Sequence, residues 1–276
     1  MQSSDIGGAM ELSNTEGWNQ TENDWRLLIE GDRNICIVAE WEKKIIGTTT
    51  GINYSNQTAW IGMVLVNKEY RGQGISKSLL KNILEKLKSV KSIKLDATPA
   101  GQRVYTTLNF HNEYLITRMV TPSMKKLSPD DNSTAEPIDS GHIDQIASFD
   151  ELVFGVNRAQ LIKSLIMDNP GKAWLLRRNN SIEGFSLGRI GRKYHHVGPV
   201  YATHIDASKT LLRKALKDMS NKPVVLDVPC DKEDLIYWLQ TLGFTRQRDF
   251  VRMFKKENPL PGKLSMQYGI CGPEFG

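Results

Sequence analysis

The chain repeats itself, and this internal repeat constrains the fold more than any other feature of the sequence. Short segments of the first half return in the second half in the same order: Ile61-Gly62-Met63-Val64 as Val197-Gly198-Pro199-Val200, Ser76-Lys77-Ser78-Leu79-Leu80 as Ser208-Lys209-Thr210-Leu211-Leu212, Leu95-Asp96 as Leu226-Asp227, Leu108-Asn109-Phe110 as Leu242-Gly243-Phe244, and Arg118-Met119 as Arg252-Met253. Matched positions differ by 131 to 136 residues, and chance explains such a steady offset poorly. We therefore predict a duplicated domain, for which 276 residues are sufficient.

The local patterns of the first copy predict a mixture of helices and strands. Apolar and β-branched runs predict a hairpin over 34–40 and 45–52, followed by a third strand over 60–66. Apolar residues at steps of three and four predict an amphipathic helix over 75–87. Strands at 93–99 and 113–119 enclose a short helix at 100–108, and residues 1–34 are predicted to be helical in two pieces. Thr21 and Asp24 have the spacing of a capping box at the start of the second piece.

A glycine-containing loop joins the third strand to the amphipathic helix. Its sequence is Arg71-Gly72-Gln73-Gly74-Ile75-Ser76. Glycines allow backbone N–H groups to approach an anion, and the helix N-terminus adds a partial positive charge. The dinucleotide fingerprint does not fit, because Lys77 stands where its third glycine is needed, and the P-loop spacing is absent. The loop predicts a phosphate site, with a tight turn that binds nothing as the alternative.

This loop resembles the acyl-CoA loop of the GNAT superfamily of N-acetyltransferases, Arg/Gln-x-x-Gly-x-Gly/Ala, with Ser76 at the last position. The element order over residues 5–122 matches the GNAT fold, although the usual first strand would have to lie before Met1 or be lost. The whole chain is similar to tandem GNAT proteins with a degenerate second domain, a group matched by Phe154-Gly155-x-Asn157-Arg158 and by residues 272–276.

The resemblance implies an α/β (α+β) fold of two tandem GNAT-like domains, each a mixed, mostly antiparallel sheet flanked by helices. We expect residues 1–122 to form the catalytic domain. Residues 123–137 are polar and contain prolines, as is typical of a linker. Residues 138–276 are expected to form the degenerate domain, which shapes the acceptor site.

The second copy lacks the features that carry chemistry in the first. Eleven residues separate Val64 from Ser76, but only seven separate Val200 from Ser208, and these seven include neither glycine nor arginine. The position that matches Tyr105 holds Leu239. We therefore expect one acetyl-CoA per chain, bound by the first domain.

The resemblance also implies which residues bind the cofactor and which take part in the reaction. The expected cofactor contacts are Val64, Leu65 and Val66 for the pantetheine arm, Arg71, Gly72, Gln73, Gly74, Ile75 and Ser76 for the phosphates, and Thr98 where the family often has an asparagine. Tyr105 stands at the position of the tyrosine that protonates the departing thiolate, with packing on the sheet as the alternative.

The sequence does not single out a general base or an acceptor site. Asp96, Glu22, Asp24 and Glu113 are candidate bases, and a reaction without a dedicated base is equally open. Asp96 is assigned to catalysis, although its recurrence as Asp227 favours a structural role. The expected acceptor contacts are Trp18, Asn19, Asn157 and Arg158, with core packing or internal ion pairing as the alternative.

Composition excludes several other classes of protein. Three cysteines far apart form neither a disulfide framework nor a Cys-x-x-Cys site, and His195-His196 lacks metal-ligand spacing, so no metal is expected. A net charge of +5 suits an anion such as CoA and is too small to indicate nucleic acid. Without a leader or an apolar run long enough to span a membrane, we expect a cytoplasmic protein.

The resemblance to the GNAT superfamily implies an acetyl-CoA-dependent N-acetyltransferase, and we expect it to act on a primary amine of a small molecule by direct transfer. The protein would be a monomer with pseudo-symmetric domains or a homodimer. An acetyltransferase acting on a protein or peptide amine is one alternative. A non-catalytic acyl-CoA sensor is the other, and Tyr105 argues against it because a sensor needs no acid.

Overall fold

The computed structural model describes residues 1–31, 33–127 and 134–276. In the first half (residues 1–122), the elements are α1 (Ile6–Thr15), α2 (Glu22–Ile29), β1 (Ile35–Trp41), β2 (Lys44–Tyr54), β3 (Thr58–Val66), α3 (Ile75–Lys86), β4 (Ser92–Ala97), α4 (Pro99–Thr107) and β5 (His111–Thr121). The predicted capping box is present, since Thr21 and Asp24 exchange side-chain and backbone hydrogen bonds at the start of α2.

The second half (residues 138–276) repeats this order, as the sequence predicts. Its elements are α5 (Ile143–Phe154), α6 (Ala159–Asp168), β7 (Trp174–Arg178), β8 (Ser181–Ile190), β9 (His195–Ala202), α7 (Ile205–Leu216), β10 (Val224–Pro229), α8 (Glu233–Thr241), β11 (Thr245–Lys256) and β12 (Gln267–Gly269). Part of the predicted linker, residues 128–133, lies outside the described residues, and its end forms β6 (Glu136–Pro137) against β7.

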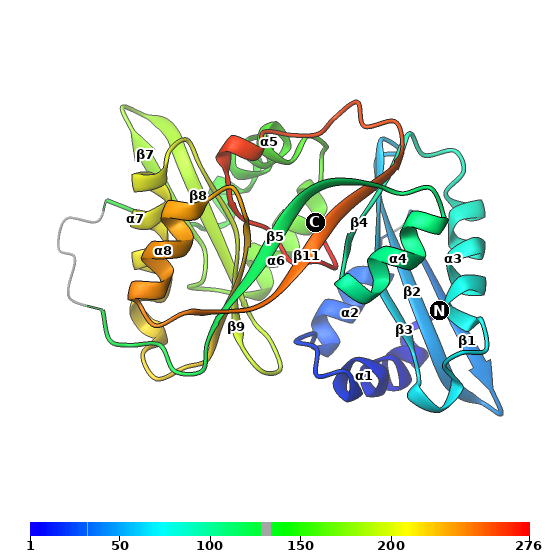
Figure 1. The fold of residues 1–276 in the computed structure, drawn as a ribbon. Helices are drawn as coiled ribbons and strands as arrows, with labels where there is room; N and C mark the ends of the chain where they lie inside the picture. Colours follow the sequence, from blue (N-terminus) through cyan, green and yellow to red (C-terminus); the bar gives the residue numbers. More distant parts are fainter. Residues whose placement is uncertain (32, 128–133) are drawn as a thin grey trace.

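The described strands form one mixed, mostly antiparallel sheet with a pseudo-symmetric order. Its main path runs β1-β2-β3-β4-β11-β5-β10-β9-β8-β7-β6. The long strands β5 and β11 pair at its centre, and Figure 1 shows them crossing the middle of the molecule between the two groups of helices. The sheet is therefore continuous through both halves.

The central strands are exchanged between the halves. β11, from the second half, pairs with β4, whereas β5, from the first half, pairs with β10. The predicted boundary after residue 122 therefore follows the chain but does not divide the sheet. A fragment of residues 1–122 would keep β5 and lose both of the strands that β5 pairs with.

A buried ion pair accompanies each exchanged strand. Arg252 on β11 lies opposite Asp96 on β4 and donates from Nε and Nη2 to its two carboxylate oxygens over 2.8 and 2.9 Å. Arg118 on β5 lies opposite Asp227 on β10 and donates in the same way over 2.7 and 2.7 Å. The repeated aspartates and arginines of the sequence thus become two equivalent links between the halves.

The C-terminal segment also ties the halves together, and Figure 1 places the C-terminus near the middle of the molecule. The Trp60 indole donates to the Pro273 carbonyl over 2.9 Å, and the Tyr54 hydroxyl donates to the Phe275 carbonyl over 2.8 Å. One apolar cluster contains residues of both halves, among them Trp25, Trp60, Phe154, Phe185 and Phe275. Burial of this shared apolar surface stabilises the two halves as one body.

Candidate active site

Strands β3 and β4 separate along their length and leave an opening. They pair in parallel only between residues 58–60 and 92–94. Beyond Trp60, β3 pairs with β2 on one side only, while the end of β4 pairs with β11. Met63 has a positive φ of 50° beside a register shift, which is the geometry of a β-bulge. Val64, Leu65 and Val66 lie on this edge of β3, which has no strand partner on the side of the cleft, although the Val66 carbonyl accepts a hydrogen bond from Arg71.

The predicted phosphate loop lies at the end of this edge. Gly72 and Gly74 have φ values of 79° and 80°, a region that favours glycine. Gly74 is the N-cap of α3 and supplies no side chain, so the first amides of α3 lack a side-chain cap. Arg71 Nη2 lies 2.6 Å from Glu16 Oε1, and Arg71 Nε donates to the Val66 carbonyl. The loop thus presents uncapped amides and one arginine.

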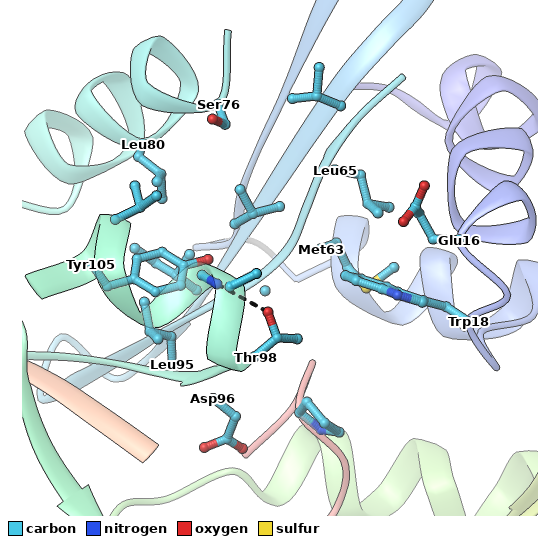
Figure 2. Close-up of a pocket in the computed structure, with 18 of the residues that line it drawn as sticks. Glu16, Trp18, Met63, Leu65, Ser76, Leu80, Leu95, Asp96, Thr98 and Tyr105 are labelled. Atoms are coloured by element: carbon cyan, nitrogen blue, oxygen red, sulfur yellow. Dashed lines mark hydrogen bonds between the residues drawn. The ribbon is translucent and has the colours of Figure 1, made fainter. Parts of the chain in front are cut away.

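Together these elements border a cleft of about 610 Å³. Of the residues predicted to bind cofactor or take part in the reaction, the lining includes Val64, Leu65, Val66, Arg71, Gly72, Gly74, Ile75, Ser76, Asp96, Thr98 and Tyr105. Gln73 belongs to the same loop but does not line the cleft. Figure 2 shows Tyr105 and Trp18 on opposite sides, with the Tyr105 hydroxyl directed into the space between them.

Tyr105 is positioned by the packing of its ring. The ring packs edge-on against Phe110, with centroids 5.8 Å apart, and a side chain at Gly101 would approach the ring to 3.0 Å. Its hydroxyl makes no hydrogen bond with any residue that the structure describes. Burial raises the pKa of Tyr105 to about 12, so the phenol keeps its proton at neutral pH. A free, protonated hydroxyl facing a cleft is equipped to donate.

Thr98 has a local structural role in addition to its place in the cleft. Its Oγ1 accepts a hydrogen bond from the Gly101 amide over 3.2 Å and caps α4, whose first residue is Pro99. This N-cap fixes the start of the helix that carries Tyr105. The predicted contact with cofactor through the same hydroxyl stays a prediction.

Asp96 lines the cleft, but its carboxylate is already occupied. Both oxygens accept from Arg252, and although burial raises the pKa of Asp96, the charge of Arg252 opposes that rise. The other candidate bases are occupied as well. Asp24 pairs with Arg189, Glu22 with Arg26 and Glu113 with Lys94. These contacts favour a structural role for Asp96 and identify no general base.

The predicted acceptor residues have different surroundings, and of the four only Trp18 lines the cleft. Asn19 holds the turn between β8 and β9, donating to the Tyr194 carbonyl and accepting from the Lys193 and Tyr194 amides. Asn157 is exposed and donates to Glu151.

Arg158 is fully buried and pairs with Asp150 over 2.7 Å. It also donates to the Gly276 carbonyl. The contacts of Asn157 and Arg158 therefore do not support the predicted acceptor role, because both side chains serve the second half's own structure.

The lining also includes residues that were not predicted. Most of them, among them Glu16 after α1, belong to the first half, but the second half contributes Arg248 and Phe250 on β11 and Pro273 and Glu274 near the C-terminus. The exchange of β5 and β11 brings Arg118, Arg248 and Phe250 to the cleft. The paired repeats Asp96/Asp227 and Arg118/Arg252 were the available signal for this exchange, since they mark strands that need charged partners.

In the second half the equivalent opening is filled by the chain itself. β9 and β10 pair only at residues 195–196 and 224–225 before they separate. β12 enters the gap, pairing with β9 through Gln267 and Gly269, and the Ile270 amide donates to the Asp227 carbonyl on β10 over 2.9 Å. Leu239, which stands in the place of Tyr105, is fully buried.

Comparison with known proteins identifies the family. Residues 9–110 match the model of the acetyltransferase (GNAT) family, and residues 146–269 match the model of an acetyltransferase (GNAT) domain. The chain is a tandem GNAT protein. The degenerate character of its second domain agrees with the filled opening between β9 and β10.

Two curated relatives and one solved structure resemble almost the whole protein. Holothin acyltransferase of Pseudoalteromonas sp. (strain SANK 73390) is 23% identical over 96% of this chain and 90% of its own. The uncharacterized N-acetyltransferase YitH of Bacillus subtilis (strain 168) is 21% identical over 92% and 90%. A putative acetyltransferase from Pyrococcus horikoshii superposes with a TM-score of 0.83 at 20% identity, covering 100% of this chain and 94% of the other. Membership of this family supports the assignment of the protein as a transferase.

GNAT proteins generally bind acetyl-CoA, and the residues of the first half fit such a group. The uncapped amides of α3 and Arg71 suit phosphates, and the free edge of β3 suits an amide-bearing arm. Within the described residues, no three or more histidine, cysteine or acidic side chains are grouped to hold a metal ion. No described helix is both long and apolar enough to cross a membrane.

Proposed function

We propose that this protein is an acetyl-CoA-dependent N-acetyltransferase that transfers the acetyl group directly to a primary amine of a small molecule. The observation that carries the proposal is the convergence on one cleft of an uncapped helix start, a free strand edge and an unbonded phenol. These are the parts that anion binding, orientation of a reactant and proton donation require.

The cofactor would be held along β3 and at the start of α3. The amides of Gly74, Ile75 and Ser76 and the Arg71 guanidinium would bind its phosphates, and the backbone of Val64 to Val66 would bind its arm. Acetyl-CoA would supply an activated thioester whose acetyl group passes to the amine nitrogen. To contact a phosphate, Arg71 must give up or share its hydrogen bond to Glu16. Both side chains are partly exposed, so water can replace either partner in this bond.

Tyr105 is the proposed acid of the reaction. Its Oη faces the cleft and keeps its proton at neutral pH, because burial raises the pKa of Tyr105 to about 12. The hydroxyl donates no hydrogen bond to any residue that the structure describes, so it is free to donate to a ligand. A positioned acid of this kind contributes about 10²- to 10⁴-fold to a rate. The amine proton would leave to solvent or to an unassigned group, because the buried carboxylates of the cleft are engaged by arginines.

A small acceptor suits the shape of the cleft better than a protein does. The lining includes residues of β11 and of the C-terminal segment, so both halves enclose the cleft that contains Tyr105. The cleft volume of about 610 Å³ must also hold part of the cofactor, which leaves room for an acceptor of modest size.

The rival proposal is a sensor that binds acyl-CoA without transfer. A free phenol in the cleft argues against a sensor, because a sensor needs no acid. In addition, a relative that matches nearly the whole chain bears the name holothin acyltransferase. The deciding experiment measures thiol release from acetyl-CoA with panels of amino acids, polyamines and aminoglycosides. Release that depends on one amine and is lost in Tyr105→Phe supports the proposal. Acetyl-CoA binding without amine-dependent release would contradict it.

A further inference from the structure

Arg248 brings to the cleft a positive charge that forms no ion pair with any residue the structure describes. It lies on β11 directly opposite Arg118 on β5, an arrangement of like charges that is unfavourable in a sheet. Arg118 is neutralised by Asp227, to which it donates two hydrogen bonds of 2.7 Å. Arg248 forms no ion pair within the described residues, and its buried Nε has no hydrogen-bond partner there.

The surroundings of Arg248 make this charge costly. Burial first, and the charge of Arg118 second, lower the pKa of Arg248 to about 10, although the carboxylates of Asp227 and Glu274 oppose this. Both guanidinium groups lie 5.1 Å from the centroid of the Phe250 ring. The ring orders the two cations on its surface but supplies no full negative charge.

A surplus negative charge lines the same cleft. Arg189 pairs with two carboxylates at once, Asp24 over 3.0 Å and Glu274 over 2.6 Å. Of these three residues, Glu274 lines the cleft together with Arg248. The cleft therefore offers one unmatched cation and one surplus carboxylate charge to an entering molecule. The other charged groups of the lining, Asp96, Glu16, Arg71 and Arg118, are each matched by a partner.

We propose that Arg248 binds the carboxylate of the acceptor, so that the acceptor is an amine that also carries a carboxylate. Such a zwitterion matches both charges, with its carboxylate on the arginine and its ammonium attracted by Glu274 before the amine is deprotonated for reaction. A planar guanidinium suits a carboxylate well, and a single unmatched cation suits a monoanion. This inference rests on the proposed function of the same cleft.

The test compares amino acids with matched amino alcohols as acceptors at saturating acetyl-CoA. The pairs are glycine with ethanolamine, β-alanine with 3-amino-1-propanol, and 4-aminobutyrate with 4-amino-1-butanol. We expect the wild-type protein to favour the acid of the best pair by about ten- to a hundred-fold in kcat/KM, the size expected of a hydrogen bond to a charged group.

In Arg248→Met that preference should disappear, mainly through KM, and Arg248→Lys should restore part of it. Arg246→Met, at an exposed position of the same strand, is the matched control and should retain the preference. A wild-type protein without preference, or a preference that survives Arg248→Met, would overturn the inference. A separate titration of acetyl-CoA gives a further contrary outcome. If Arg248→Met raises KM for acetyl-CoA equally with acid and alcohol acceptors, Arg248 binds the cofactor and not the acceptor.

Failure of the proposed function would be visible separately. If the wild-type protein acetylates none of these amines, calorimetry with N-acetyl-4-aminobutyrate in the presence of CoA decides the inference. Binding by the wild-type protein that Arg248→Met loses would uphold the anion site. Absent binding, or equal binding by both proteins, would refute it.

Discussion

The two halves share one framework and differ in what occupies the opening between their separating strands. In the first half, β3 and β4 part after Trp60 and border an open cleft. In the second half, β9 and β10 part in the same way, and β12 together with the following Ile270 fills the gap with backbone hydrogen bonds to both strands. A strand in that opening satisfies the backbone groups that a ligand would otherwise bind. The comparison shows that this fold persists with or without an accessible site.

What the halves hold in common is structural. Each contributes one long strand, β5 or β11, to the sheet of the other, and each exchange carries a buried aspartate–arginine pair. What they do not share, namely the glycine loop, the free phenol and the open edge, is the set of features to which we assign chemistry. The comparison can therefore be tested by changing equivalent positions in both halves.

The largest effect should come from breaking the two equivalent ion pairs. Asp96→Asn and Asp227→Asn each remove the charge that neutralises a buried arginine, and each should lower the free energy of unfolding of the full chain by about 3–5 kcal/mol. Denaturant unfolding measures this, with the exposed Asp249→Asn on β11 as the control. Losses below about 1 kcal/mol would mean that these pairs do not secure the exchange.

The next largest effect should come from Tyr105, which only the first half has. Tyr105→Phe keeps the ring and removes the acid, so kcat should fall by about ten- to a thousand-fold while the affinity for acetyl-CoA is unchanged. The matched control is Tyr237→Phe, an exposed tyrosine on α8, the helix of the second half that corresponds to α4. If both variants turn over at the wild-type rate, Tyr105 is a packing residue only.

Most elements of the fold could be predicted from the sequence because they depend on local patterns. The helix over 75–87 follows from the periodicity of its apolar residues, and the strand over 60–66 follows from its apolar and β-branched run. The capping box of Thr21 and Asp24 marks the start of α2. The exchange of strands could not be predicted in this way. β5 and β11 carry the same Arg-Met pair, so either could lie beside β4 or β10, and the choice depends on long-range packing.

The candidate site was predicted where it follows a motif and missed where it depends on the exchange. Arg71 to Ser76 and Tyr105 belong to contiguous patterns of the first copy. Arg248 and Glu274 reach the cleft from the second half, about 140 residues or more along the chain from Tyr105, and no local pattern connects them. For Arg158 the sequence leaves an internal partner and a ligand both open, and its pairing with the buried Asp150 supports the internal partner.

A smaller difference between the halves concerns the pH dependence of stability. The repeat aligns Trp60 of the first half with His196 of the second, where the imidazole is buried between Arg189 and Asp227 and near Glu274. Burial first, and Arg189 second, lower the pKa of His196, although both carboxylates oppose this. The unfolded chain, with a histidine pKa near 6.5, therefore binds more protons as the pH falls, and the folded state loses stability between about pH 7 and pH 5.

His196→Gln should make the free energy of unfolding fall less steeply over that range. Denaturant unfolding at several pH values measures the slope, and His111→Gln, at an exposed position, should leave it unchanged. An unaltered slope in His196→Gln would show that this imidazole does not contribute to the difference between the halves.

The central claim is that the chain binds acetyl-CoA at one place, the open cleft of the first half. Calorimetric titration of the full chain tests it most directly, together with Gly74→Val and the control Gly171→Val, a glycine of similar φ and equally open space in the second half. We predict one acetyl-CoA per chain, at least about tenfold weaker binding in Gly74→Val because a β-branched residue strains the loop, and unchanged binding in Gly171→Val. Two sites per chain, or full affinity in Gly74→Val, would contradict the account.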